Sequence, residues 1–177
     1  MSDNVEKFYF SGNGRVPNSR FPTLVYRGIS TGSVLDMEEL IRANDWHPTW
    51  HNSMGMIPNH HFHAEAHEII VINSGELDCQ LGGHDGARTT LRAGDAVVIP
   101  AGVGHLGVGF TEDLRVTGGF PAGYCFLDFR LGYADEYYEL AERASLIPVP
   151  AKDPFFGAQG HLPKIWNAAA VASNYRI

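Results

Sequence analysis

Cysteine is rare in this sequence, and clusters of basic residues are missing from it. Only Cys79 and Cys125 occur, and they are not spaced as CxxC. This argues against a disulfide framework and a cysteine-based zinc site, so we expect two reduced thiols in the core. The 13 Lys and Arg are scattered, and the formal net charge is −7. We therefore expect no nucleic acid or membrane surface as a partner, and a small molecule instead.

Long apolar runs are also missing. No stretch approaches the roughly 18 apolar residues of a membrane span. The start MSDNVEKFYF carries acidic residues where a signal peptide has a basic segment and an apolar run. We expect a soluble, cytoplasmic protein. A Walker loop, a dinucleotide fingerprint and a nucleophile elbow are absent too, so nucleotide chemistry and serine hydrolysis have no support.

Glycine and proline, by contrast, are spread along the whole chain, with 20 and 10 residues. Many short strands joined by tight turns explain this better than a few long helices, which favours a mainly β fold. A chain of 177 residues, 44% of them hydrophobic, can bury one sizeable core. We expect one structural domain.

Three regions are predicted along the chain. Residues 1–50 form an elaboration packed on the main fold, with extended runs FYF and TLVYR and a helix in VLDMEELIRAN, for which Ser33 and Asp36 have capping-box spacing. Residues 51–132 hold the strands, as the runs HEIIVIN, ELDCQL, RTTL, DAVVI, HLGVGF, LRVTGGF and YCFLDF. Residues 133–177 hold one helix, at about 134–144, and a tail too rich in Pro and Gly to be regular.

Histidine is concentrated in one part of the sequence, since five of the nine lie between residues 47 and 63. His61 and His63 are two residues apart, so in a strand both imidazoles lie on one face and can share one metal ion. His47, His51 and His60 have no partner at a fixed spacing. They fit the entrance of a site or ordinary loop positions.

The third ligand is either His67 or Glu68, which face opposite sides of the next strand. If residues 74–75 form a two-residue turn, this strand and the following one form a hairpin. Its opposed pairs are Ile72 with Leu77, Ile70 with Cys79, and Glu68 with Leu81. This register gives an apolar inner face with one carboxylate at its rim. Glu68 is therefore the predicted ligand, and His67 is predicted to face outward, as a surface residue or a support of the site.

A fourth ligand has to come from a distant strand. The strand DAVVI ends in a rigid turn, Pro100 to Gly104, and His105 follows directly. Three imidazoles and one carboxylate suit Fe, Mn, Ni, Co, Cu or Zn as a divalent ion and leave coordination positions open. Calcium and magnesium prefer more oxygen ligands. We therefore predict one divalent transition metal bound by His61, His63, Glu68 and His105.

The spacing of these residues resembles that of the two cupin motifs. Gly55, His61, His63, Glu68 and Gly75 match the first motif, and Gly94, Pro100, Ala101, Gly102 and His105 match the second. The second motif usually ends in an Asn where this chain has Gly109, but that Asn is not a ligand. The resemblance implies a double-stranded β-helix, or jelly-roll, barrel with the metal inside. VPNSRFPTLVYRG, HFHAEAHEIIVI, LGGHDG, GDAVVIPAGVGH, GGFPAG and DPFFGAQG further resemble the YjlB-like subgroup of cupins, over nearly the whole chain.

A substrate pocket is predicted beside the metal. If His105 points inward, strand alternation sends Gly107 and Gly109 inward too, which leaves either room for a ligand or a local bulge. Cys79 is predicted as pocket wall. Trp46, Trp50, Phe62, Tyr124 and Phe126 are candidates for stacking on a substrate or for core packing. Asp128 and Arg130 either anchor a polar substrate or lie on a solvated face.

Three functions fit such a site. The first is an oxidoreductase of the dioxygenase type, acting on a small organic molecule, as the resemblance implies for many single-domain cupins; Glu68 would then also accept a proton from the substrate. The second is a redox-neutral isomerase or hydrolase, and the third is a non-enzymatic metal or small-molecule binding protein. We also expect a homodimer, because Ile69 and Val71 on the outer face need cover from the N-terminal strands or a partner barrel.

Overall fold

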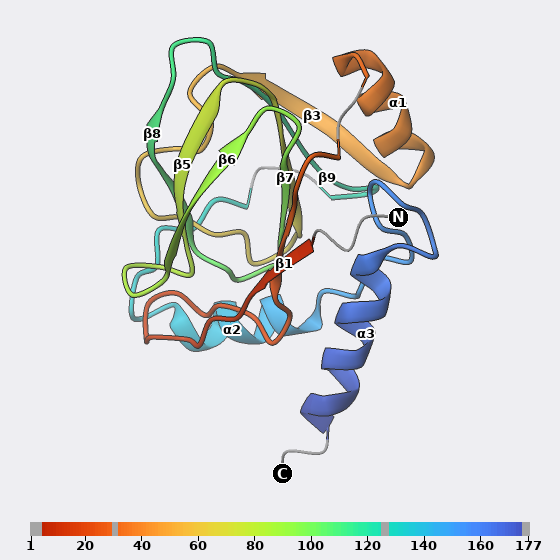
Figure 1. Ribbon diagram of the computed structural model, residues 1–177. Coiled ribbons are helices and arrows are strands. Elements are labelled where there is room, and N and C mark those ends of the chain that lie inside the picture. Colours follow the sequence, from red (N-terminus) through yellow and green to blue (C-terminus); the bar gives the residue numbers. More distant parts are fainter. Residues whose placement is uncertain (1–4, 30–31, 125–127, 175–177) are drawn as a thin grey trace.

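The computed structural model describes residues 5–29, 32–124 and 128–174. This part of the chain contains nine strands and three helices, and Figure 1 shows how they are arranged. The strands are β1 (Val5–Phe8), β2 (Thr23–Tyr26), β3 (Trp46–Asn52), β4 (Glu68–Ser74), β5 (Glu76–Leu81), β6 (Ala87–Arg92), β7 (Ala96–Ile99), β8 (His105–Phe110) and β9 (Arg115–Pro121). The helices are α1 (Val34–Ala43), α2 (Tyr137–Leu146) and α3 (His161–Asn174).

The described strands form two antiparallel sheets. The larger has the order β1-β2-β7-β4-β9-β3 and the smaller the order β6-β5-β8. An apolar cluster joins inward side chains of both sheets, among them Ile70, Ile72 and Val97 from the larger and Leu77 and Leu81 from the smaller. The predicted mainly β jelly roll is confirmed, and the core lies between its two sheets.

The larger sheet is buried on its outer face as well. Ile69 and Val71 of β4 belong to a second apolar cluster, which also contains residues of β2, α1 and the C-terminal tail. Trp166 of α3 stacks on Phe21, with ring centroids 5.2 Å apart. The cover that Ile69 and Val71 need is therefore supplied by the chain's own N- and C-terminal segments.

The helices match the predictions only in part. Ser33 caps α1 with Asp36 in a capping box, as predicted, and α1 packs beside β3 (Figure 1). The second predicted helix starts and ends slightly later than expected, at Tyr137–Leu146. The tail is irregular only to residue 160, because α3 follows. Pro163 is compatible with this helix because it lies in the first turn, where its missing N–H is not needed.

The predicted hairpin of residues 68–81 is wrong. β4 pairs with β7 and β9, whereas β5 pairs with β6 and β8. The chain thus crosses from one sheet to the other at the turn that contains Gly75. Ile70 and Cys79 therefore belong to the same core cluster but are not paired on neighbouring strands. Glu68 still faces inward, because this crossing leaves strand alternation unchanged.

The boundary predicted at residue 50 falls within β3, which belongs to the barrel sheet. The predicted strand YCFLDF covers residues 125–127, which lie outside the described part, and Cys125 and Phe126 lie there with it. No helix among the described residues is long and apolar enough to cross a membrane.

Candidate metal centre

The four predicted ligands come together at one end of the barrel. His61 and His63 lie in the segment before β4, while Glu68 and His105 are the first residues of β4 and β8. His61 and His105 are bridged by two backbone hydrogen bonds, of 3.2 and 2.9 Å. The amide of Gly102 also donates to the carbonyl of His63, at 2.7 Å. Backbone pairing thus fixes the 61–63 segment against the start of β8.

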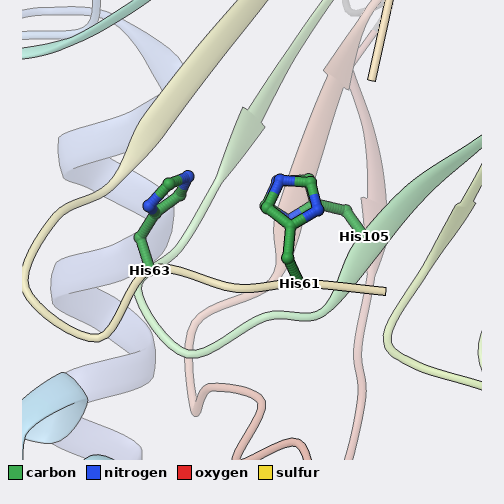
Figure 2. A group of neighbouring side chains, drawn as sticks. All are labelled: His61, His63 and His105. Atoms are coloured by element: carbon green, nitrogen blue, oxygen red, sulfur yellow. The ribbon is translucent and has the colours of Figure 1, made fainter. Parts of the chain in front are cut away.

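The side chains of these residues converge. One ring nitrogen from each of His61, His63 and His105 lies within 4.8 Å of the other two, and Figure 2 shows the three imidazoles on the same side of their two segments. Oε2 of Glu68 lies 3.1 Å from Nε2 of His105 and 3.5 Å from Nε2 of His63. All four residues are buried. The positions that form this cluster are the ones predicted from their spacing.

Each imidazole is oriented by a backbone carbonyl. Nδ1 of His61 pairs with the carbonyl of Asn59 and Nδ1 of His105 with that of Val103, both at 3.0 Å. Nδ1 of His63 pairs with the carbonyl of Asp128. A carbonyl only accepts, so each Nδ1 must donate, and the neutral ring keeps its Nε2 lone pair for the centre of the cluster.

Two atoms at this centre have no hydrogen-bond partner. Oε2 of Glu68 and Nε2 of His105 are both buried and unpaired. Leaving a buried acceptor unpaired costs about 1–3 kcal/mol, and a cation held between these atoms would remove that cost. Three imidazole nitrogens and a carboxylate oxygen are the donors that divalent transition metals prefer. The residues present therefore fit such an ion.

The charges of the cluster are strongly coupled. Burial raises the pKa of Glu68, but the nearby imidazoles of His63 and His105 outweigh burial and hold this pKa well below its usual range. Burial also disfavours the charged form of His63, yet the Glu68 carboxylate outweighs it and raises the pKa of His63. His61 has its pKa lowered to about 3, by burial and then by His105. Glu68 is thus ionised and His61 neutral near pH 7, as metal ligands have to be.

The cluster opens onto a cavity of about 280 Å³. Its wall is mostly apolar and aromatic. The lining residues are Thr49, Trp50, Asn52, Gly55, Met56, Ile57, His61, His63, Glu68, Ile70, His105 and Phe129. An open coordination position of a bound metal would face a space large enough for a small molecule.

The predicted pocket residues Cys79, Gly107 and Gly109 do not line this cavity. Gly107 faces inward, but a Cβ there would lie 2.5 Å from the carbonyl oxygen of Met56, so the polypeptide itself fills the space. A register shift between Asp78 and Cys79 pairs Gly109 with Asp78 and leaves Val108 as the extra residue. The bulge alternative is therefore the correct one. Cys79 is fully buried in the core cluster, where burial raises its pKa to about 12.

His67 is not part of the cluster. Its Nδ1 accepts a hydrogen bond from the amide of Ala101 at 2.9 Å, and its Nε2 pairs with the carbonyl of Pro148 at 3.1 Å. The ring is buried against Trp166, with ring centroids 4.7 Å apart. His67 faces away from the metal centre as predicted, but the tail covers it, so it is not a surface residue.

The segment of residues 128–130 belongs to the site, and the sequence did not assign it there. Besides orienting His63, it places Phe129 on His61, with centroids 4.7 Å apart. The carboxylate of Asp128 accepts the amide of Glu65 and pairs with Arg130 at 2.7 Å. Asp128 and Arg130 thus pair with each other, and neither lines the cavity. The role of this segment in orienting His63 and His61 is visible only in the structure, where the segment lies next to residues 62–65. The spacing of residues in the sequence does not indicate it.

Comparison with known proteins agrees with this geometry. The family model described as "Cupin domain" matches residues 49–115, which include all four predicted ligands. The curated protein YjlB of Bacillus subtilis (strain 168), which is itself uncharacterized, is 34% identical over 167 residues, covering 94% of this chain and 99% of that protein.

Solved structures with a related fold include two enzymes. One is the 3,4-ketoisomerase QdtA from Thermoanaerobacterium thermosaccharolyticum, with 15% identity, a TM-score of 0.45, and coverage of 81% of this chain and 98% of that one. The other is an oxalate decarboxylase, with 16% identity, a TM-score of 0.38, and coverage of 63% and 28%. Unrelated reactions often share one fold, so these activities describe those proteins alone.

Proposed function

Because the chain belongs to the cupins, and among them to the YjlB-like subgroup, we propose that it is a metal-dependent oxidoreductase of the dioxygenase type. It would bind one divalent transition metal through His61, His63, Glu68 and His105 and act on a small organic molecule. The observation that supports this most is the pair of buried, unpaired atoms at the floor of the cavity, Oε2 of Glu68 and Nε2 of His105.

The cavity favours redox chemistry over redox-neutral acid–base chemistry. An isomerase or hydrolase needs acidic or basic groups placed around the substrate. Apart from the four predicted ligands, the described lining residues with polar side-chain groups are Thr49, Asn52 and Trp50, through its indole N–H, and none of the three is an acid or a base near pH 7. The Asn52 amide is used by the turn at residues 54–55, since it accepts from the amide of Gly55 at 2.7 Å and donates to its carbonyl at 3.0 Å.

The chain's own residues have separate roles in this proposal. A bound iron, manganese, nickel or copper ion would supply a Lewis-acidic, redox-active centre that can use dioxygen. The three imidazoles hold the ion, and Glu68 both completes the ligand set and can accept a proton at a carboxylate oxygen. The apolar wall, with Ile70 and Phe129 next to the ligands, keeps bulk water from the reacting molecule.

Elemental analysis tests the proposal. Protein expressed without added metal should carry roughly one transition-metal ion per chain, and His61→Ala or His105→Ala should lose it while the fold survives. His47→Ala is the matched control, because His47 is exposed and lies outside the cluster. Iron, manganese, nickel or copper, with oxygen consumed in the presence of small organic substrates, would support an oxidoreductase.

Other outcomes would point elsewhere. Zinc as the native metal would contradict the oxidoreductase and move the proposal to a redox-neutral isomerase or hydrolase. Metal content in His105→Ala equal to that in wild type would contradict the ligand set itself. A site that holds metal but turns over no substrate would indicate a binding protein.

A further inference from the structure

The cavity above the four ligands has a chemical character that restricts what it can bind. We propose that the substrate is a small, largely apolar molecule that offers one oxygen-bearing group to the metal and carries no charge at its far end. This inference rests on the metal site proposed above. The evidence for it is the set of side chains that form the cavity wall. A variant of one of these wall residues tests the inference without changing the predicted ligands.

Two aromatic rings of the wall are held in place. Trp50 lies on the inner face of β9 at Gly118, where an added Cβ would be only 1.8 Å from Cε2 of the indole. Because Gly118 has no side chain, the indole of Trp50 can pack directly against the backbone of β9. Phe129 is nearly parallel to the ring of His61, with an interplanar angle of 21°. Together with Met56 and Ile57, these rings give a substrate apolar surface to contact.

Groups that could neutralise a distant charge are missing from the wall. No Lys or Arg lines the cavity within the part of the chain that the structure describes. Arg130 is next to Phe129, but its Nε pairs with Oδ1 of Asp128 at 2.7 Å. The Asn52 side chain is used by its own turn, which leaves the hydroxyl of Thr49 and the indole N–H of Trp50, neither of which carries a charge. A charge at the far end of a substrate would be desolvated here without a partner, which is strongly unfavourable.

The metal end has the opposite character. Glu68 is the one carboxylate among the described lining residues, so a divalent cation beside it would keep a net positive charge and suit a neutral or singly anionic oxygen donor. The size of the cavity is a second limit. Its volume of about 280 Å³ lies near the lower end of the range for small-molecule sites, roughly 300–1,000 Å³, so the cavity suits a small ligand.

Two para-substituted benzoates test the proposal. 4-Methylbenzoate and terephthalate offer the same carboxylate to a metal and differ only at the far end, which is a methyl group or a second carboxylate. Each is titrated into Co(II)-loaded protein while the visible absorption of the cobalt site is recorded. We expect 4-methylbenzoate to bind at least about tenfold more tightly, because the second carboxylate of terephthalate finds no partner. Equal or tighter binding of terephthalate, or no binding of either probe, would overturn the proposal.

A variant of the wall gives the reverse test. Ile57 lines the cavity and is 46% exposed, so Ile57→Arg places a cation at the rim without disturbing the core. This variant should still bind Co(II) and should tighten terephthalate about tenfold. Val171→Arg, on the exposed face of α3 (56% exposed), adds the same charge elsewhere and should change neither affinity. If Ile57→Arg keeps the wild-type preference for 4-methylbenzoate, the proposed role of the cavity wall is contradicted. It is also contradicted if Val171→Arg tightens terephthalate binding as much as Ile57→Arg does.

The two proposals fail in different ways. Absence of the cobalt absorption in wild type would refute the metal site, and the substrate class would fall with it. A normal cobalt spectrum with a preference for terephthalate would refute the substrate class alone.

Discussion

The adjacent residues His67 and Glu68 point to opposite sides of the larger sheet and have different roles. Glu68 points to the centre of the ligand cluster while His67 points into the apolar layer that covers the outer face of the larger sheet. Both nitrogens of His67 are used by backbone groups, from Ala101 and Pro148. Burial lowers the pKa of His67 to about 4, so it is neutral near pH 7 and ties the tail to the barrel.

His67→Ala should therefore leave the metal content unchanged and reduce stability. The substitution leaves the Ala101 amide and the Pro148 carbonyl unpaired and opens a cavity beside Trp166, for a total loss of about 2–5 kcal/mol. Urea unfolding followed by circular dichroism measures the loss, and elemental analysis of the same sample measures the metal. Loss of metal without loss of stability would make His67 a ligand and refute our assignment.

The clustering of the four predicted ligands could be predicted at this scale because period-two spacing and motif distances are local properties. His61 and His63 share a face in any extended segment, and the turn before His105 is visible in the sequence. The orientation of Gly109 could not be predicted in this way. It depends on a bulge in β8, where Val108 is left unpaired because Asp78 pairs with Gly109 and Cys79 with Gly107. Alternation along β8 alone does not reveal a bulge that is defined by the partner strand.

Among the elements, the 128–130 segment is the one that couples the metal centre to the rest of the fold. Its backbone pairs with Phe62 through two hydrogen bonds of 3.0 Å, and its Asp128 carbonyl orients His63. The Asp128 side chain in turn holds the segment through the Glu65 amide and Arg130. We infer that Asp128 is a positioning residue for His63.

Asp128→Ala should weaken metal binding about 10–100-fold, because the carbonyl that orients His63 is no longer held in place. Competition with a chelator for Co(II) measures the affinity, and the cobalt absorption spectrum should change shape as His63 turns. Asp135→Ala, at an exposed position nearby in the sequence, is the control. A loss of stability with unchanged affinity and spectrum would reduce Asp128 to a purely structural role.

The C-terminal tail is attached to the sheet by one buried carboxylate. Asp153 accepts the hydroxyl of Tyr26 at 2.7 Å and the backbone amides of Phe155, Phe156 and Leu162. These bonds lock the turn before α3 onto β2. Burial, and then the Asp153 carboxylate, raise the pKa of Tyr26 well above its usual range.

This raised pKa predicts a loss of stability in alkali. The folded protein keeps the Tyr26 proton, whereas the unfolded chain releases it above about pH 10. The folded state then binds more protons, so the free energy of unfolding falls as the pH rises beyond 10. Tyr26→Phe should be about 1 kcal/mol less stable at pH 8 but should decline less steeply above pH 10. Urea unfolding between pH 8 and 11 compares the two, and equal slopes would contradict the prediction.

The elements show a second limit of prediction from sequence. Helix α1 was predictable because its capping box is a local signal, but the partners of β4 and β5 were not. A turn at residues 74–75 fits both a hairpin and a crossing between sheets, and only the packing of the whole barrel decides between them. The inward position of Glu68, beside His63 and His105, could be predicted because both alternatives place it on the inner face.

At the scale of the whole molecule, the structure removes the reason given for a homodimer. Ile69 and Val71 are fully buried within a single chain. Large apolar side chains do remain exposed elsewhere, among them Met54, Val108 and Phe110 at 62%, 42% and 54%. We retain the homodimer as a proposal on that ground. Light scattering at micromolar concentration should give a mass near twice 19.4 kDa, and a mass near 19.4 kDa would refute it.

The fold as a whole should not depend on the metal. Large apolar clusters cover both faces of the larger sheet, whereas the four ligands occupy one end of the barrel. Without an ion, Glu68 still faces His63 and His105, so its charge is not left isolated. Protein treated with a chelator should keep its circular dichroism and unfold cooperatively. Metal at about 100 times its Kd should then stabilise it by about 2.7 kcal/mol, since the ion binds only the folded state. A chelated chain that is unfolded, as a metal-free zinc finger is, would show instead that the ion holds the barrel together.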